Sequence, residues 1–125
     1  MIVGVGIDMV SIGRLQGLLE RRGERALARL FTAAEVGRCR ESRHPPESFA
    51  ARFAAKEAFF KALGTGWGRG GDWTDVEVVS APSGAPSLRL SGTARELAES
   101  RGVRTIHLSL THLEDTAAAF VVLEG

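Results

Sequence analysis

The chain has 125 residues, of which 44% are hydrophobic and 25% charged. It contains sixteen Lys and Arg residues and fifteen Asp and Glu residues, which gives a net charge of +1. This composition is that of an ordinary globular protein, excludes a disordered or highly charged tail protein, and at this length predicts one domain over residues 1–125. Because small domains bury a smaller share of their surface than large ones, association of subunits is expected.

The cysteine content predicts a reducing compartment. Cys39 is the only cysteine, so the chain has neither an internal disulfide nor a cysteine pair for structural zinc, and Cys39 itself is interpreted as a small helix residue. The apolar run at the N-terminus ends at Asp8, well short of a secretory or membrane-spanning segment. We therefore expect a cytoplasmic protein with no membrane partner.

The first elements in the chain are a strand and a helix. Residues 2–7 combine Ile and Val with glycine, which is typical of a buried strand, and Asp8 follows at the predicted strand end. A helix is predicted over residues 11–22, and Gly23 interrupts it. At the end of a strand, Asp8 is either a cap for that helix or an exposed functional carboxylate.

Two further helices follow. Thr32 and Glu35 have the spacing of a capping box, which predicts a helix that begins at Thr32 and ends before the paired prolines. The strongest helix is predicted over residues 46–63, with Gly64 as its C-terminal cap. Four glycines in residues 65–71 then exclude a regular element.

The second half of the chain is richer in strands. Period-two patterns and turn residues predict a hairpin of strands 76–79 and 87–90, a short helix over 93–101, and strands over 105–111 and 117–123. The helices in the first half and the strands in the second predict an α+β fold, with helices packed on one face of a mainly antiparallel sheet.

The positive charge is concentrated in one stretch. Between Arg14 and Arg43 there are eight arginines and four glutamates, so this stretch carries +4 and the remainder of the chain −3. A nucleic-acid-binding domain usually has a larger basic excess over its whole length, which argues against a nucleic-acid partner. The stretch is either a solvated helix surface or a contact for an acidic partner.

The helix before the glycine-rich loop contains four charged residues at helical spacing. Arg52 and Lys56, and Glu57 and Lys61, are four residues apart, which predicts three cations around one carboxylate. Ordinary surface pairing at about 0.3 to 0.5 kcal/mol per pair is the simpler interpretation. A functional role is favoured because Lys56 and Lys61 are the only two lysines of the chain. In addition, a glycine-rich loop follows directly, and its bare backbone can approach a ligand.

A carboxylate with cations one turn away can hold a phosphate and a divalent metal together. Magnesium prefers one or two carboxylates completed by water and substrate phosphates, so Glu57 with Asp8 is a candidate metal pair. His112, beside Thr111 at a strand end, is a candidate contact for a nucleotide or phosphate.

Other kinds of site have weak support. The glycine loop contains G-x-G-x-x-G, but it follows a helix, whereas a dinucleotide site needs this pattern after a strand and before a helix. The chain has no P-loop sequence, and nothing around Cys39 indicates a lowered thiol pKa.

Three segments together resemble a known family. The sequences I-V-G-V-G-I-D-M-V-S-I-G-R-L at 2–15, F-A-A-R-F-A-A-K-E-A-F-F-K-A-L-G-T-G at 49–66, and H-L-S-L-T-H with A-A-A-F-V-V-L-E within 107–124 are similar to those of the holo-acyl-carrier-protein synthases. These are the small bacterial 4′-phosphopantetheinyl transferases. The resemblance implies magnesium-dependent transfer of phosphopantetheine from coenzyme A to a serine of apo acyl carrier protein, with release of adenosine 3′,5′-bisphosphate.

The resemblance also implies roles for individual residues. Asp8 and Glu57 would bind magnesium, Lys61 would neutralise the pyrophosphate and protonate the leaving phosphate, and Glu57 or a metal-bound water would take the serine proton. The other implied coenzyme contacts are Arg52, Lys56, Gly64, Thr65, Gly66, Thr111 and His112. The implied contacts for the acidic carrier protein are Arg14, Arg21, Arg22 and Arg25.

The resemblance further implies a homotrimer with active sites between neighbouring subunits. Neither Trp67 nor Trp73 matches a role in the family. The competing hypothesis is a non-catalytic adaptor whose arginine-rich helix binds an acidic protein or RNA and which needs neither Asp8 nor Glu57.

Overall fold

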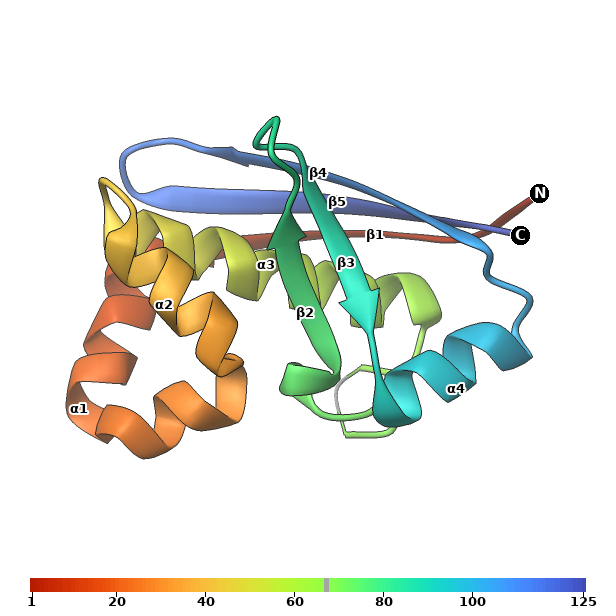
Figure 1. Cartoon of the computed structure of the whole chain (residues 1–125), viewed down its shortest axis with the longest axis horizontal. Coiled ribbons are helices and arrows are strands. Elements are labelled where there is room, and N and C mark those ends of the chain that lie inside the picture. The colour runs from red at the N-terminus through yellow and green to blue at the C-terminus, as the bar shows by residue number, and fades with distance from the viewer. Residues whose placement is uncertain (67) are drawn as a thin grey trace.

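The computed structural model describes residues 1–66 and 68–125, and a three-stranded antiparallel sheet with helices on one face lies at its centre (Figure 1). The strand order is β1-β5-β4, with β1 at Ile2–Ser11, β5 at Thr116–Glu124 and β4 at Thr105–His112. Strands β2 (Val76–Ser80) and β3 (Pro86–Leu90) pair as a hairpin and form a second, separate sheet. The predicted α+β class is confirmed, but the sequence pattern does not indicate that the hairpin stands apart.

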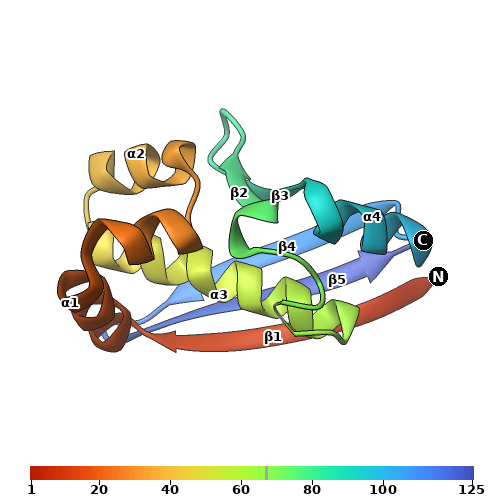
Figure 2. The same cartoon turned by 90° about the horizontal axis from the view of Figure 1, so that it is seen from below.

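One helix, α3, lies along the sheet, and the other helices are grouped at its two ends (Figure 2). The bounds are Ile12–Leu30 for α1, Ala33–Glu41 for α2, Pro45–Leu63 for α3, Gly92–Ser100 for α4 and Trp73–Asp75 for the short 3-10 helix η1. The predicted interruption of α1 at Gly23 is confirmed: this residue leaves the helical conformation, at a φ of 69°, and a second helical segment that was not predicted then continues to Leu30. No helix in the described parts of the chain has the length and apolar character needed to cross a membrane.

The two predicted helix caps are confirmed. The backbone N–H of Glu35 donates to Oγ1 of Thr32 at 3.2 Å, and the N–H of Thr32 donates to Oε1 of Glu35 at 3.0 Å. Gly64 ends α3 in the left-handed conformation and donates to the carbonyl groups of Phe60 and Lys61. The second cap places Lys61 in the last turn of α3.

Strand β1 is longer than predicted and lies directly against α3. The expectation that the strand ends at Asp8 is wrong, because pairing with β5 continues to Ser11 and sets Asp8 opposite Ala119. A Cβ atom on Gly6 would lie 2.0 Å from the carbonyl oxygen of Ala58. Glycine is therefore required at this contact, which brings Asp8 within reach of α3.

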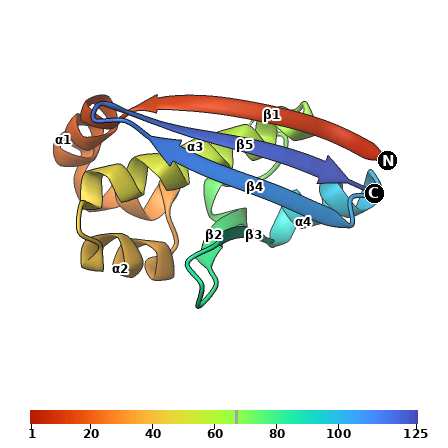
Figure 3. The same ribbon diagram turned by 90° about the horizontal axis from the view of Figure 1, so that it is seen from above.

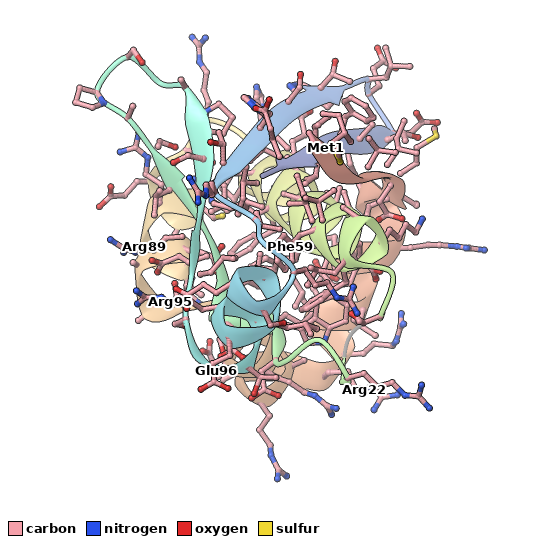
Figure 4. All side chains as sticks on the ribbon, turned by 90° about the vertical axis from the view of Figure 1, so that its right-hand side faces the viewer. Met1, Arg22, Phe59, Arg89, Arg95 and Glu96 are labelled. Carbon is pink, nitrogen blue, oxygen red and sulfur yellow. The ribbon has the colours of Figure 1, made fainter. Side chains whose placement is uncertain are left out.

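The core lies between α3 and the inner face of the sheet. Phe59 of α3 is completely buried, and Figure 4 shows it in the interior while Arg22, Arg89 and Arg95 lie at the periphery. From β5, Ala117, Ala119, Val121 and Leu123 point into the same core. Cys39 is also fully buried, as expected of a small helix residue.

The outer face of the same sheet is exposed, and along β1 and β5 it is mainly apolar. Figure 3 shows β1, β5 and β4 side by side, with the helices behind them. On β1, Val5, Ile7 and Met9 are 57%, 60% and 70% exposed, and Phe120 of β5, opposite Ile7, is 44% exposed. Exposed apolar side chains gathered on one face are typical of a contact with another protein surface.

Candidate active site

Asp8 and Lys61 form an ion pair between β1 and the last turn of α3. Nζ of Lys61 lies 2.9 Å from Oδ1 of Asp8 and donates a second hydrogen bond, of 3.1 Å, to the carbonyl oxygen of Ile7. The Lys61 side chain is 54% exposed, whereas that of Asp8 is only 14% exposed. The hydrogen bond to Asp8 raises the pKa of Lys61, so the lysine is a cation with a third N–H available to an anionic ligand.

Glu57 faces the same space as Asp8, one turn before Lys61. Residues of β1, α1 and α3 surround an open hollow of about 620 Å³, here called the carboxylate hollow. Burial, and then the charge of Asp8, raise the pKa of Glu57, while the charge of Lys61 partly offsets both effects. Two carboxylates thus share one hollow with only partial neutralisation.

The carboxylate pair fits a divalent metal. Repulsion between Asp8 and Glu57 contributes to the raised pKa of Glu57, and a bound cation would relieve that repulsion. Within residues 1–66 and 68–125, no three His, Cys, Asp or Glu side chains form a cluster suited to a metal. The chain would therefore supply two ligands at most, in keeping with the preference of magnesium for water and phosphate oxygens at its other positions.

The turn after α3 exposes backbone next to Lys61. Gly64 and Gly66 have φ values of 78° and 66°, and each has open space where a side chain would be. Oγ1 of Thr65 is buried and makes no hydrogen bond to the described residues. The turn is therefore open to a ligand that also contacts Lys61. Trp67 of the same loop lies outside the described residues.

Lys56 does not belong to this cluster, and the prediction of three cations around one carboxylate is wrong. The Lys56 side chain is 0% exposed, and its ammonium lies 2.7 Å from Oε1 of Glu35. It donates its other hydrogen bonds to the carbonyl groups of Trp73 and Val76. With every N–H occupied, Lys56 cannot also donate to a coenzyme in this arrangement.

Arg52 lies on another flank of α3, at a second hollow. Arg52, β4 and the β2–β3 hairpin enclose about 420 Å³, here called the hairpin hollow, which is lined by Arg52, Val78, Ser80, Gly84, Pro86, Leu108, Ser109 and Leu110. Nη1 of Arg52 donates to Oγ of Ser48 at 2.7 Å. Nε is buried and has no hydrogen-bond partner in the part of the chain that the structure describes. Arg52 is only 8% exposed, so it brings a largely buried positive charge to the wall of this hollow.

Thr111 and His112 lie at a third hollow, next to the hairpin hollow. This histidine hollow of about 330 Å³ also includes Arg43, His44 and Arg52. Nδ1 of His112 is 3.7 Å from Oε2 of Glu47. Glu47 and Ser48 also line this hollow and were not predicted. The four-residue spacing of Ser48 and Arg52 was a usable signal, whereas the contact between Glu47 and His112 joins distant parts of the chain and has no local signature.

The predicted coenzyme-binding residues are therefore divided between two flanks of one helix. Phe53 and Glu57 of α3 line the carboxylate hollow with β1 and α1, whereas Ser48 and Arg52 line the other hollows with β4 and the hairpin. The body of α3 lies between the two groups and packs against the sheet (Figure 2). Within one chain the two groups therefore lie apart, and each is here called a half-site.

The arginines of α1 border the carboxylate hollow and extend beyond it. Arg14 and Arg21 line that hollow together with Asp8 and Glu57. Arg22 and Arg25 line a neighbouring hollow of about 660 Å³, which shares Leu18 with the first. All four arginines are exposed, so they form a basic surface that leads to the two carboxylates.

Comparisons with known proteins consistently match one family. The family model of the 4′-phosphopantetheinyl transferase superfamily matches residues 4–121. A holo-acyl-carrier-protein synthase of Desulforudis audaxviator is 50% identical over 125 residues, which cover 100% of this chain and 95% of the relative. One of Koribacter versatilis is 45% identical over 124 residues, which cover 99% of both chains.

Solved structures are similar over the whole chain. The holo-acyl-carrier-protein synthase of Neisseria meningitidis is 34% identical, with a TM-score of 0.92 and coverage of 100% of both chains. That of Helicobacter pylori, in complex with coenzyme A, is 31% identical, with a TM-score of 0.85 and coverage of 96% of this chain and 99% of the other.

Proposed function

The chain belongs to the holo-acyl-carrier-protein synthase family of 4′-phosphopantetheinyl transferases, and we propose that its reaction transfers phosphopantetheine from coenzyme A to a serine of apo acyl carrier protein, depends on magnesium and releases adenosine 3′,5′-bisphosphate. The resemblance seen in the sequence is thus confirmed, and the chain is an enzyme and not an adaptor. The observation that carries the proposal is that Asp8 and Glu57 share one hollow at the edge of the arginine-rich helix, with Lys61 bonded to Asp8.

Phosphoryl transfer depends on positioning and on neutralisation of charge more than on covalent chemistry by the protein. Asp8 and Glu57 would hold magnesium, which when bound supplies positive charge to the pyrophosphate oxygens. Lys61 contributes a fixed cation beside them and can give a proton to the leaving phosphate. The exposed turn from Gly64 to Gly66 lies next to Lys61, where its backbone can approach the pyrophosphate.

Glu57 is the group that takes the serine proton, directly or through a water molecule. Its raised pKa makes it a stronger base than an ordinary glutamate, because the proton is held more tightly at a partly buried site near Asp8. The charge of nearby Lys61 opposes the rise in the pKa of Glu57 and so favours the ionised form that a base requires.

The nucleotide half of coenzyme A is assigned to the hairpin hollow and the histidine hollow. Arg52, which lines both hollows, supplies positive charge for a phosphate, and Thr111 and His112 border the second of them. The H. pylori relative is described in complex with coenzyme A, which supports coenzyme A as the substrate. Lys56 has no direct role in this proposal.

The acidic carrier protein would dock on α1. Arg14 and Arg21 would then guide its serine into the carboxylate hollow, while Arg22 and Arg25 extend the contact. Complementary charge of this kind raises the rate of association and weakens as salt rises.

A homotrimer accounts for the two half-sites and for the outer sheet face. Asp8 and Glu57 of one subunit would meet Arg52 and His112 of its neighbour, so that coenzyme A spans the interface. Val5, Ile7, Met9 and Phe120 would become buried between subunits. A heterologous contact repeated three times closes a ring.

Intact-protein mass spectrometry tests the reaction. An apo acyl carrier protein is incubated with the enzyme, coenzyme A and magnesium, and EDTA or the Glu57→Gln variant is used in parallel. We expect the carrier to gain one phosphopantetheinyl group only in the complete mixture. Transfer that survives both EDTA and Glu57→Gln would refute the metal assignment, and no transfer to any of several carriers would refute the proposed reaction.

A further inference from the structure

Glu35 and Lys56 form a fully buried ion pair that connects three parts of the fold. Both side chains are 0% exposed, and 2.7 Å separates Nζ of Lys56 from Oε1 of Glu35. Lys56 is in the middle of α3, and Glu35 is in the first turn of α2. Burial lowers the pKa of Lys56, against the attraction of Glu35, so removal of either partner would leave a costly isolated charge or polar group.

Apart from the capping bond that Oε1 of Glu35 accepts from the N–H of Thr32, the other hydrogen bonds of this pair go to the segment that begins the β2–β3 hairpin. Lys56 donates to the carbonyl oxygens of Trp73 at 3.0 Å and Val76 at 2.7 Å. Oε2 of Glu35 accepts a 2.9 Å hydrogen bond from the backbone N–H of Val78. Three backbone groups across residues 73–78 are therefore bound to the buried pair.

The hairpin depends on such contacts for its position. Strands β2 and β3 are hydrogen-bonded to each other but belong to a different sheet from β1, β5 and β4. The hairpin is not paired with the main sheet, so its distance from β4 must be fixed by other contacts. A second link runs from Oγ1 of Thr32, beside Glu35, to Oε2 of Glu77 at 2.6 Å.

That distance determines the width of the hairpin hollow. Val78 and Pro86 of the hairpin form one wall, and Leu108 and Leu110 of β4 line the hollow as well. Arg52, one turn before Lys56 on α3, lies in the same hollow. Val78 thus donates a backbone hydrogen bond to the buried pair and also lines the hairpin hollow.

We propose that Glu35 and Lys56 are positioning residues for coenzyme A, which hold the β2–β3 hairpin at the distance that the nucleotide requires without touching it. This inference rests on the proposed function, because it takes the hairpin hollow as the nucleotide site. It replaces the direct coenzyme contact that the sequence led us to expect of Lys56.

The double variant Glu35→Gln/Lys56→Met tests the proposal, because it removes both charges at nearly constant volume. Neutral replacement of a whole buried ion pair often preserves stability, whereas removal of one partner does not. We expect a melting temperature close to that of the wild type, a KM for coenzyme A raised about tenfold, and kcat and the KM for the carrier protein changed by less than about twofold. Amide hydrogen exchange at Val78 should become faster.

The matched control is Arg95→Met/Glu99→Gln, which removes an exposed ion pair on α4. It should leave every one of these quantities unchanged. If the double variant is as stable as the wild type and also has a wild-type KM for coenzyme A, the pair is structural only and the proposal is wrong.

Two further measurements keep the test decisive. If the double variant does not fold, Glu35→Asp keeps the charge but shortens the link to Val78, and the same rise in KM is expected. Calorimetric binding of adenosine 3′,5′-bisphosphate separates this proposal from the proposed function. Weaker binding to the double variant supports the positioning role even if no carrier is modified, and equal binding overturns it.

Discussion

Lys61 bonds to Asp8 at 2.9 Å and thereby joins the last turn of α3 to the interior of strand β1. The two residues are 53 positions apart in the chain, so their contact depends on how closely the helix and the strand pack. That approach is permitted by Gly6, which has no side chain to meet the Ala58 carbonyl. The geometry of the candidate active site is thus a direct consequence of a glycine in the first strand.

Removal of the Lys61 cation should abolish most of the activity without unfolding the protein. Lys61→Met is expected to lower kcat by about 10² to 10⁴, the usual contribution of a positioned proton donor. Lys61 is 54% exposed, but Asp8 is only 14% exposed and loses its ion-pair partner, so a moderate fall in the melting temperature with retention of the fold is expected. Steady-state kinetics of Lys61→Met and Lys61→Arg would measure this. Lys61→Arg retains the charge and should lose less of the activity. Full activity in Lys61→Met would exclude a catalytic role for Lys61.

Gly6→Ala should disrupt the packing of β1 on α3. The new methyl group would lie 2.0 Å from the Ala58 carbonyl oxygen, so helix and strand must separate. We expect a loss of at least about 1 to 3 kcal/mol in the free energy of unfolding, measured by urea denaturation. Gly13→Ala is the control: nothing lies within 4 Å of its Cβ position, so it should be neutral or slightly stabilising.

Much of this fold follows from local sequence signals. The capping box of Thr32 and Glu35 and the C-terminal cap at Gly64 were correctly predicted because their determinants lie within a few residues. The same is true of the hairpin, whose turn residues lie between two period-two segments. Sequence motifs also identified Asp8, Glu57 and Lys61, which the structure brings to one hollow or its edge.

Long-range pairing was beyond those signals. The spacing on α3 places Lys56 beside Arg52, yet Lys56 forms its ion pair with Glu35, 21 residues earlier in the chain. Glu35 had already been explained by its local capping role, and nothing in its neighbours indicates a second, buried partner. Likewise, the strand was expected to end at Asp8 because a carboxylate is unusual in a buried strand, but the carboxylate there is paired with Lys61.

Glu57→Gln should stabilise the protein at neutral pH while it abolishes transfer. Burial and the charge of Asp8 raise the pKa of Glu57 above its ordinary 4.5, so the folded state binds the proton more tightly than the unfolded state. Ionised Glu57 therefore subtracts from stability at any pH above its folded pKa. Because the group is only half-buried, the gain in Glu57→Gln should be no more than about 1 kcal/mol.

The pH dependence of that gain has a definite sign. The difference in melting temperature between Glu57→Gln and the wild type should be largest at neutral pH and should vanish below pH 4.5, where Glu57 is protonated in both states. Thermal unfolding at pH 8 and pH 4 measures it. A variant that is less stable than the wild type at pH 8 would contradict the raised pKa.

Charge reversal on α1 should weaken the interaction with the carrier protein. Arg14→Glu and Arg21→Glu are each expected to raise the KM for the carrier at least about tenfold, with the KM for coenzyme A unchanged. The wild-type kcat/KM should fall as salt increases, and the variants should show a shallower dependence. Arg38→Glu, on the exposed surface of α2, is the matched control. An equal effect of all three variants would indicate that only net charge matters.

Mixed assemblies of two inactive variants test whether active sites form between subunits. Asp8→Asn disables one half-site and Arg52→Met the other, so neither homotrimer is expected to be active at low coenzyme A. In a trimer assembled at random from equal amounts, a site is intact when an Arg52→Met subunit supplies Asp8 and an Asp8→Asn neighbour supplies Arg52. Each condition holds for half of the subunits, so co-refolded mixtures should recover about a quarter of wild-type activity. A mixture that stays inactive, although mass spectrometry shows exchanged subunits, would place both half-sites in one chain and would require coenzyme A to take a path around α3.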